Sequence, residues 1–191
     1  IMRPVFAAAK TSLQRVAYAE GEDERVLRAV QVVVEEGLAK PILIGRPAVI
    51  AARIEKAGLR LQAGVDFEIC NPEDDPRFRQ YWEAYHRIMG RDGVTPETAK
   101  SAVRRSNTLI AALMVKLGDA DAMLAGLVGR FDRHLDYIET VLGHHANADR
   151  LATVNALLLE GRTLFIADTY INEDPTAEEL AQIAQMAAEE V

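Results

Sequence analysis

The segment Gly126-Leu127-Val128-Gly129-Arg130 contains the residues of this 191-residue chain best suited to binding a charged ligand. Its two glycines allow a ligand to approach the backbone closely, and the start of a predicted helix follows them. Arg130 adds a guanidinium group. The segment therefore predicts a phosphate-binding turn. It matches neither the G-x-G-x-x-G fingerprint nor the P-loop, so it indicates no nucleotide, and a simple strand-to-helix turn remains the alternative.

An excess of basic residues surrounds this turn. From Lys100 to His134 there are six Lys and Arg residues and three Asp residues, which leaves a local charge of +3. The whole chain is acidic, with 22 basic and 29 acidic residues, a net charge of −7 and a pI near 5.2. Such a chain is unsuited to non-specific nucleic-acid binding. The local excess suits a polyanionic small molecule, although helix surfaces also carry bases without any ligand.

A second polar cluster, Ala167 to Pro175, follows a predicted strand and precedes a capped helix. Asp168 and Asn172 are the two residues in it that could orient a ligand at the carboxyl end of that strand. The same side chains could instead form the hydrogen bonds of the turn itself, as Asp and Asn often do. The sequence does not decide between these two roles.

Metal and covalent chemistry have little support. The single cysteine, Cys70, excludes an internal disulfide and a multi-cysteine metal site, and it fits a reducing cytoplasm. Glu83 and His86 have the spacing of half a di-iron site, but a second Glu-x-x-His is missing, which favours a structural role. We therefore predict no metal ligand and no catalytic residue. No apolar run approaches the roughly 18 residues that predict a membrane span.

Strand-like and helix-like segments alternate along the chain, with short β-prone runs followed by 3.6-residue apolar periods. This alternation predicts an α/β fold in which a mostly parallel sheet is covered by helices on both faces, a three-layer arrangement. In such sheets, ligands bind beyond the carboxyl ends of the strands. The predicted strands are residues 15–19, 40–44, 66–70, 122–125, 151–159 and 163–166.

Capping signals predict where the helices begin. Asp75 is the predicted N-cap of one helix, with Pro76 at its first helical position. Thr176 and Glu179 form a capping box that opens the last helix. Three further helices are predicted to start at Asp23, Thr95 and Ser106.

Both ends of the chain are unusual. Ile1 precedes Met2, and the apolar stripe of the last helix, which includes Leu180, Ile183 and Ala187, stops in mid-pattern. We expect the chain to be an excerpt of a longer protein, and this stripe to be buried within that protein or against a neighbour. The polar stretch from Gly143 to Arg150 predicts a domain boundary.

Three segments together resemble the phosphate acetyltransferases: residues 15–26, 113–121 and 165–175. The resemblance extends over nearly the whole chain. It is closest to the phosphotransacetylase-like C-terminal domain of the large bacterial NADP-dependent malic enzymes. The segments specific to that subgroup are residues 1–5, 129–134 and 155–159.

The resemblance implies an isocitrate/isopropylmalate-dehydrogenase-like fold that is incomplete here. Residues 1–148 would form the first α/β domain and residues 149–191 the beginning of the second, with coenzyme A and acetyl phosphate bound in the cleft between them. Arg105 stands where the family has an arginine that binds phosphate or coenzyme A. A second family arginine is replaced by Asp136, whose negative charge would repel acetyl phosphate.

The resemblance also implies a regulatory, acetyl-CoA-sensing and oligomerising domain of a malic enzyme that converts malate to pyruvate. The alternative is a fragment of an active phosphate acetyltransferase. We expect the fragment itself to be non-catalytic and free of cofactors, with acetyl-CoA as its effector. NADP and a divalent metal would belong to the N-terminal malic enzyme domain. The expected setting is a cytoplasmic homo-oligomer, and the predicted acyl-CoA or phosphate-binding residues are Arg105, Gly126, Gly129, Arg130, Asp168 and Asn172.

Overall fold

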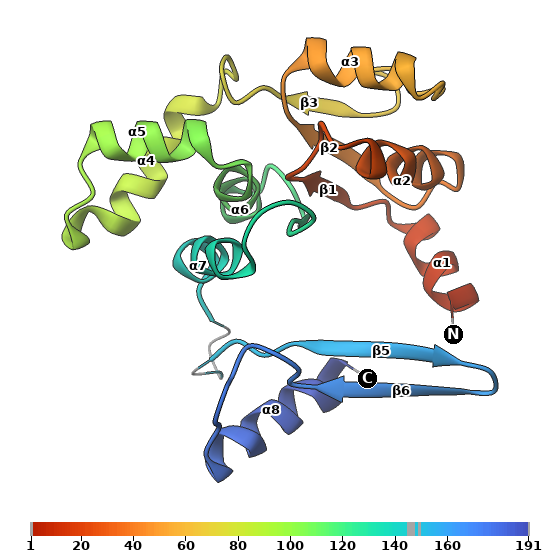
Figure 1. The fold of residues 1–191 in the computed structure, drawn as a ribbon, viewed down its shortest axis with the longest axis vertical. Coiled ribbons are helices and arrows are strands. Elements are labelled where there is room, and N and C mark those ends of the chain that lie inside the picture. The colour runs from red at the N-terminus through yellow and green to blue at the C-terminus, as the bar shows by residue number, and fades with distance from the viewer. Residues whose placement is uncertain (1, 145–147, 149, 191) are drawn as a thin grey trace. The chain divides into compact units, whose positions relative to one another are not determined.

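The computed structural model describes residues 2–144, 148 and 150–190. The chain divides into two compact units, Ile1–Leu142 (unit 1) and Gly143–Val191 (unit 2). Each unit has its own sheet, which is accompanied among the described residues by seven α-helices in unit 1 and followed by one helix in unit 2 (Figure 1).

Unit 1 is built on a four-stranded parallel sheet with the strand order β3-β2-β1-β4. The chain adds β2 and β3 on one side of β1 and later returns to place β4 on the other side. The direction of winding therefore reverses between β1 and β4. These strands confirm the first four predicted runs, and they are β1 (Arg15–Tyr18), β2 (Lys40–Ile44), β3 (Glu68–Cys70) and β4 (Ala122–Leu124).

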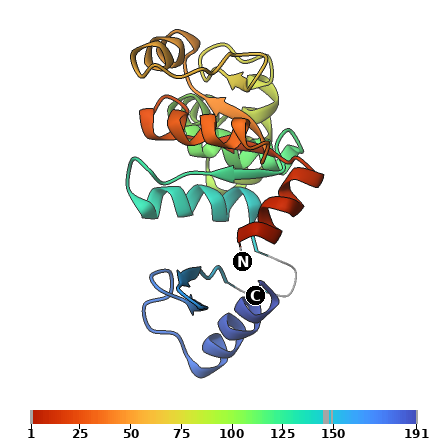
Figure 2. The same cartoon turned by 90° about the vertical axis from the view of Figure 1, so that its right-hand side faces the viewer.

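Alternate strand residues contribute to two apolar clusters, one on each face of this sheet. Ala17 and Ile42 belong to the cluster formed with α4 to α7, whereas Tyr18 and Leu43 belong to the cluster formed with α2 and α3. The sheet is therefore the middle layer of three, as Figures 1 and 2 show. The helices are α1 (Met2–Thr11), α2 (Glu24–Glu35), α3 (Pro47–Lys56), α4 (Phe78–Met89), α5 (Pro96–Arg105), α6 (Asn107–Leu117) and α7 (Phe131–Leu142), with the short 3-10 helix η1 (Gly90–Asp92) after α4.

Helix α6 is buried on all sides. Every residue from Thr108 to Met114 is buried, and this continuous stretch is typical of a central helix rather than a surface one. The hydroxyl of Ser106 caps its first turn by accepting a hydrogen bond from the Leu109 N–H, 3.2 Å away. Gly118 ends the helix in the left-handed region, with φ of 80°.

Most of the predicted helix starts are confirmed, and one is wrong. Asp23 and Thr95 accept hydrogen bonds from backbone N–H groups of the helices that follow them. Asp75 does not cap α4, which begins at Phe78. Its carboxylate instead accepts a hydrogen bond from the Arg77 N–H at 2.9 Å and holds a turn ahead of the helix. A local Asx turn has replaced the helical cap there.

Unit 2 consists of a hairpin and one helix. β5 (Val154–Leu159) and β6 (Arg162–Ala167) pair in antiparallel register, and α8 (Ala177–Glu190) follows. The two strands confirm the predicted runs, although their pairing differs from the parallel pattern of unit 1. Only two residues, Glu160 and Gly161, lie between the strands, and so short a connection joins antiparallel strands. The predicted capping box of α8 is present, with the Thr176 N–H donating to the Glu179 carboxylate at 2.6 Å.

Unit 2 leaves much apolar surface exposed. The hairpin has large side chains on both faces that are between 38% and 51% exposed. On α8, Ile183 is buried as predicted, whereas Leu180 is 53% exposed. No helix among the described residues combines the length and the apolar character needed to cross a bilayer. The assignment of residues 149–191 to the beginning of a second α/β domain stays a prediction.

The central position of α6 predicts a large difference between two leucine substitutions. Leu113 on α6 is fully buried, whereas Leu124 on β4 is 54% exposed. Leu113→Ala should lower the free energy of unfolding by about 2–5 kcal/mol, because it leaves a cavity in the core. Leu124→Ala, the control, should lower it by less than about 1 kcal/mol. Urea unfolding of both variants measures the difference, and equal losses would contradict the central role of α6.

Candidate anion-binding site

A cavity of about 610 Å³ opens in unit 1 beyond the carboxyl ends of β1 and β4. This is the point where the winding of the sheet reverses, and open α/β sheets bind their ligands at such points. Three more elements complete the walls: the end of α5, the start of α6 and one face of α7. The lining residues include Glu20, Arg105, Thr108, Gly129, Arg130 and Arg133.

The loop Gly126–Arg130 forms one wall of this cavity. Gly126 and Gly129 have φ values of 108° and 113°. Residues other than glycine rarely adopt such a backbone conformation. The Gly126 N–H donates a hydrogen bond of 2.8 Å to the carboxylate of Glu20, which follows β1. This bond fixes the beginning of the loop to the neighbouring strand end. Gly126 therefore anchors the loop, whereas Gly129 and Arg130 face the cavity.

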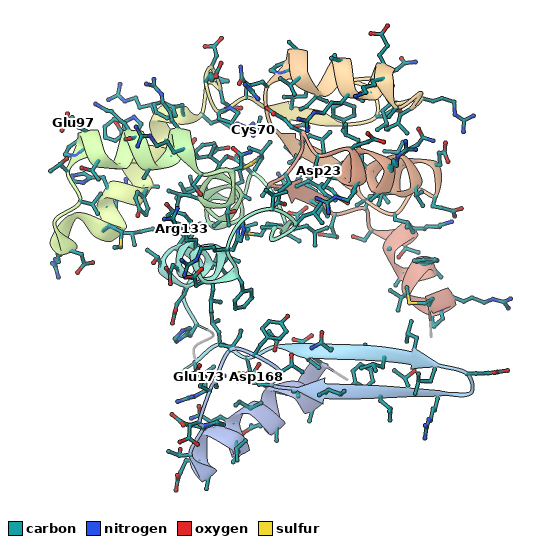
Figure 3. All side chains as sticks on the ribbon, viewed as in Figure 1. Asp23, Cys70, Glu97, Arg133, Asp168 and Glu173 are labelled. Atoms are coloured by element: carbon teal, nitrogen blue, oxygen red, sulfur yellow. The ribbon has the colours of Figure 1, made fainter. Side chains whose placement is uncertain are left out.

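Three arginines line the cavity, and they differ in how far their charges are neutralised. Arg130 pairs with Asp132 in a bidentate contact, with N–O distances of 3.0 and 2.5 Å. The guanidinium groups of Arg105 and Arg133 have no hydrogen-bond or ion-pair partner among the residues that the structure describes. Figure 3 labels Arg133 on α7, the helix that packs beside α6. The cavity thus offers two unpaired cations to a ligand.

The predicted proximity of Arg105 and the glycine turn is confirmed, since Arg105, Gly129 and Arg130 line the same cavity. The repulsion of acetyl phosphate expected from Asp136 stays a prediction. Asp136 is exposed and does not line the cavity, and Arg133, one turn earlier on α7, faces it instead. The ligand-binding roles of these residues stay predictions.

Sequence reasoning missed several lining residues on α6 and α7. Arg133, His134 and Tyr137 line the cavity together with Arg130. Their spacing of three, four and seven residues from Arg130 is that of one helical face, and this pattern was a signal that could have found them. Thr108 carried no comparable signal, because the six residues that follow it on α6 are apolar.

Asp168 and Asn172 lie in unit 2 and form a network of their own. The Asp168 carboxylate accepts hydrogen bonds from the backbone N–H and hydroxyl of Thr153, and from the backbone N–H and side-chain amide of Asn172. The carbonyl oxygen of the Asn172 side chain accepts from Arg150 at 2.9 Å, and Arg150 also pairs with Glu179. Figure 3 labels Asp168 at the end of β6. Both oxygens of Asp168 are therefore already engaged within unit 2.

Ionisation of Asp168 is favoured by this network. Burial opposes the charged form, but the hydrogen bonds from Thr153 and Asn172 outweigh it and hold the pKa of Asp168 well below its usual range. These contacts explain the polar cluster after β6 without a ligand. A ligand-binding role for Asp168 and Asn172 stays a prediction.

Comparisons with known proteins show the family of this chain. All 191 residues match the family model described as phosphate acetyl/butaryl transferase. The chain belongs to this family. A phosphotransacetylase from Streptococcus pyogenes has the same fold over 96% of this chain and 56% of its own length, with a TM-score of 0.85 and 28% identity.

This chain is also similar to proteins that are named malic enzymes. It is 51% identical to the NADP-dependent malic enzyme of Salmonella typhimurium and 50% identical to an NAD-dependent malic enzyme of Rhizobium meliloti. Each comparison covers the whole chain and 25% of the relative. A phosphate acetyltransferase of Nitratidesulfovibrio vulgaris is 32% identical over 92% of the chain and 24% of the relative. The chain thus spans about a quarter of the length of these relatives.

Cys70 and His86, two residues of metal-ligating types, are both engaged within unit 1. Cys70 is fully buried at the end of β3 (Figure 3), and burial raises the pKa of its thiol. The Nδ1 atom of His86 lies 2.8 Å from the Val94 carbonyl oxygen, so this ring is held by the backbone. Among the described residues, no three His, Cys, Asp or Glu side chains come together as a metal site would require.

The Asp168 network predicts a pH-dependent stability of unit 2. Asp168→Asn replaces one carboxylate oxygen by an NH₂ group, which cannot accept the hydrogen bonds that Thr153 and Asn172 donate. The substitution should therefore lower the free energy of unfolding by about 1–3 kcal/mol at neutral pH. The pKa of Asp168 is lowered on folding, so its contribution is fully present above its ordinary pKa of 3.8 and is lost as the pH falls below that value.

The measurement is thermal unfolding of both proteins between pH 7 and pH 2. The difference between the native protein and Asp168→Asn should shrink as the pH falls. Asp174→Asn, an exposed carboxylate in the same segment, is the control and should change stability little. A constant difference at all pH values would show that the charge of Asp168 has no part in the network.

Proposed function

We propose that this chain is the phosphotransacetylase-like C-terminal domain of a bacterial malic enzyme, and that it senses acetyl-CoA in the cavity of unit 1. The observation that carries the proposal is the pair of unpaired arginines, Arg105 and Arg133, in a cavity at the switch point of the sheet. The 51% identity to an NADP-dependent malic enzyme supports the assignment of the parent protein as a malic enzyme.

The cavity suits the phosphate groups of an acyl-CoA. Arg105 and Arg133 come from different helices, so a ligand between them would receive charge-assisted hydrogen bonds from two directions. Arg130 contributes less, because Asp132 neutralises it. The Gly126–Arg130 loop leads directly into α7, and the backbone N–H groups at a helix start favour an anion. Positive charge, an exposed backbone and a helix start therefore act on the same ligand.

In the parent protein, the chemistry would lie outside this domain. Oxidative decarboxylation of malate to pyruvate would take place in an N-terminal malic enzyme domain that binds the nicotinamide cofactor and a divalent metal. Of the two relatives above, one is named NADP-dependent and the other NAD-dependent. We propose NADP because residues 1–5, 129–134 and 155–159 resemble the NADP-dependent subgroup. The domain would contribute regulation and homo-oligomer contacts in a cytoplasmic enzyme.

The alternative function is acetyl transfer between acetyl phosphate and coenzyme A. The family description and the 32% identical phosphate acetyltransferase favour it. Asp136 does not line the cavity of unit 1, so its charge does not argue against this function at that cavity. An assay of the full-length protein for acetyl-CoA formation from acetyl phosphate separates the two functions: a malic enzyme regulator forms none above a control without protein.

Removal of Arg105 should weaken acetyl-CoA binding without unfolding the protein. Arg105→Ala removes a charge-assisted contact of about 1.5–3 kcal/mol, which is roughly a 10- to 150-fold loss of affinity. Folding should be nearly unchanged, since Arg105 is exposed and has no partner among the described residues. The measurement is calorimetric titration of the full-length protein with acetyl-CoA.

The matched control is Arg91→Ala, which removes an exposed arginine on η1 away from the cavity. It should bind acetyl-CoA as the native protein does. Inhibition of malate turnover by acetyl-CoA should weaken in parallel with binding in Arg105→Ala. Equal affinities of Arg105→Ala and the native protein would contradict the assignment of the cavity.

A further inference from the structure

Thr108 is a polar residue at the start of an apolar buried helix. It is only 5% exposed, and the six residues that follow it on α6 are all apolar and buried. A buried hydroxyl costs free energy unless it is hydrogen-bonded. Its partner is on another helix: the Oγ1 atom of Thr108 lies 2.7 Å from Nδ1 of His134 on α7.

The second ring nitrogen of His134 defines the direction of both hydrogen bonds. Nε2 lies 3.0 Å from the carbonyl oxygen of Val128, in the middle of the glycine loop. A carbonyl oxygen only accepts, so Nε2 carries the ring proton and donates it. Nδ1 of the neutral ring then accepts, and the Thr108 hydroxyl donates to it. Two hydrogen bonds thus connect the buried helix α6 to the loop.

The ring of His134 also lies directly against the loop backbone. A Cβ atom at Gly129 would stand 2.9 Å from Nε2 of His134, so a side chain there would displace this ring. The loop is therefore fixed at two places, by Glu20 at the Gly126 N–H and by His134 at the Val128 carbonyl. Gly129 and Arg130, which face the cavity, follow directly after the second of these points.

We propose that Thr108 and His134 are positioning residues that hold the Gly126–Arg130 loop in its ligand-binding form before the ligand arrives. The inference rests on the proposed function, because it assumes that the cavity binds an acyl-CoA. A loop that is already in place loses little conformational entropy when the ligand binds. The protein therefore binds the ligand more tightly than it would with a mobile loop. Neither residue needs to touch the ligand for this effect.

The test compares Thr108→Val with Thr108→Ser in the full-length protein. Val is close to Thr in shape but has no hydroxyl, whereas Ser retains the donor to His134. Titration with acetyl-CoA should show roughly a 2- to 12-fold loss of affinity for Thr108→Val, the effect of one hydrogen bond. Thr108→Ser should bind nearly as the native protein does.

Tyr81→Phe is the control for a purely structural loss. Tyr81 is 1% exposed, and its hydroxyl donates to the Asp119 carboxylate at 2.8 Å, away from the cavity. This variant also removes one interior hydrogen bond, yet its affinity for acetyl-CoA should be unchanged. Hydrogen–deuterium exchange without ligand gives an independent readout: the amides of residues 126–130 should exchange faster in Thr108→Val, but not in Thr108→Ser or Tyr81→Phe.

Two results would overturn the inference, and they are distinguishable. If the native protein binds acetyl-CoA and Thr108→Val binds it equally well with unchanged loop exchange, the positioning role is wrong and the proposed function stands. If the native protein does not bind acetyl-CoA, the proposed function is wrong and the positioning role falls with it.

Discussion

The burial of α6 is the constraint on which the rest of unit 1 depends. This helix contacts three strands, β1, β2 and β4, and three helices, α4, α5 and α7. Its apolar residues form the centre of the cluster on one face of the sheet, and such burial is the main favourable contribution to folding. Its first turn lies at the carboxyl ends of the strands. The elements that surround the cavity are therefore placed by their packing on α6.

The electrostatic character of the site follows from this packing. The chain as a whole has a net charge of −7, yet the cavity contains two guanidinium groups without an anionic partner in the described part of the chain. Elsewhere the arginines are mostly engaged: Arg46 pairs with Glu22, and Arg15 with Asp121. An unpaired cation in a cavity has not been neutralised by folding, so its full charge is available to a ligand. This contrast distinguishes the cavity from an ordinary basic surface.

Unit 2 shows the opposite balance between polar and apolar groups. Its conspicuous polar residues hydrogen-bond to one another, from Thr153 through Asp168 and Asn172 to Arg150. Its apolar residues are largely exposed on both faces of the hairpin. A two-stranded hairpin alone is marginally stable in water. The hydrogen-bond network, which ties β5, β6 and the start of α8 together, is therefore a main source of order within this unit.

The sequence by itself determined the local features of the protein. The strands, the caps at Asp23 and Ser106, the glycine turn and the local excess of basic residues were all readable, because each depends on residues within one or two turns of one another. The family resemblance could also be read from the order of its segments. The tertiary structure alone decided the contact between Thr108 and His134. That contact joins residues 26 apart in the sequence. Side-chain periodicity predicts which face of an element is buried, but it does not predict which other element covers that face. In unit 1, the packing of the other elements against α6 determines these partners.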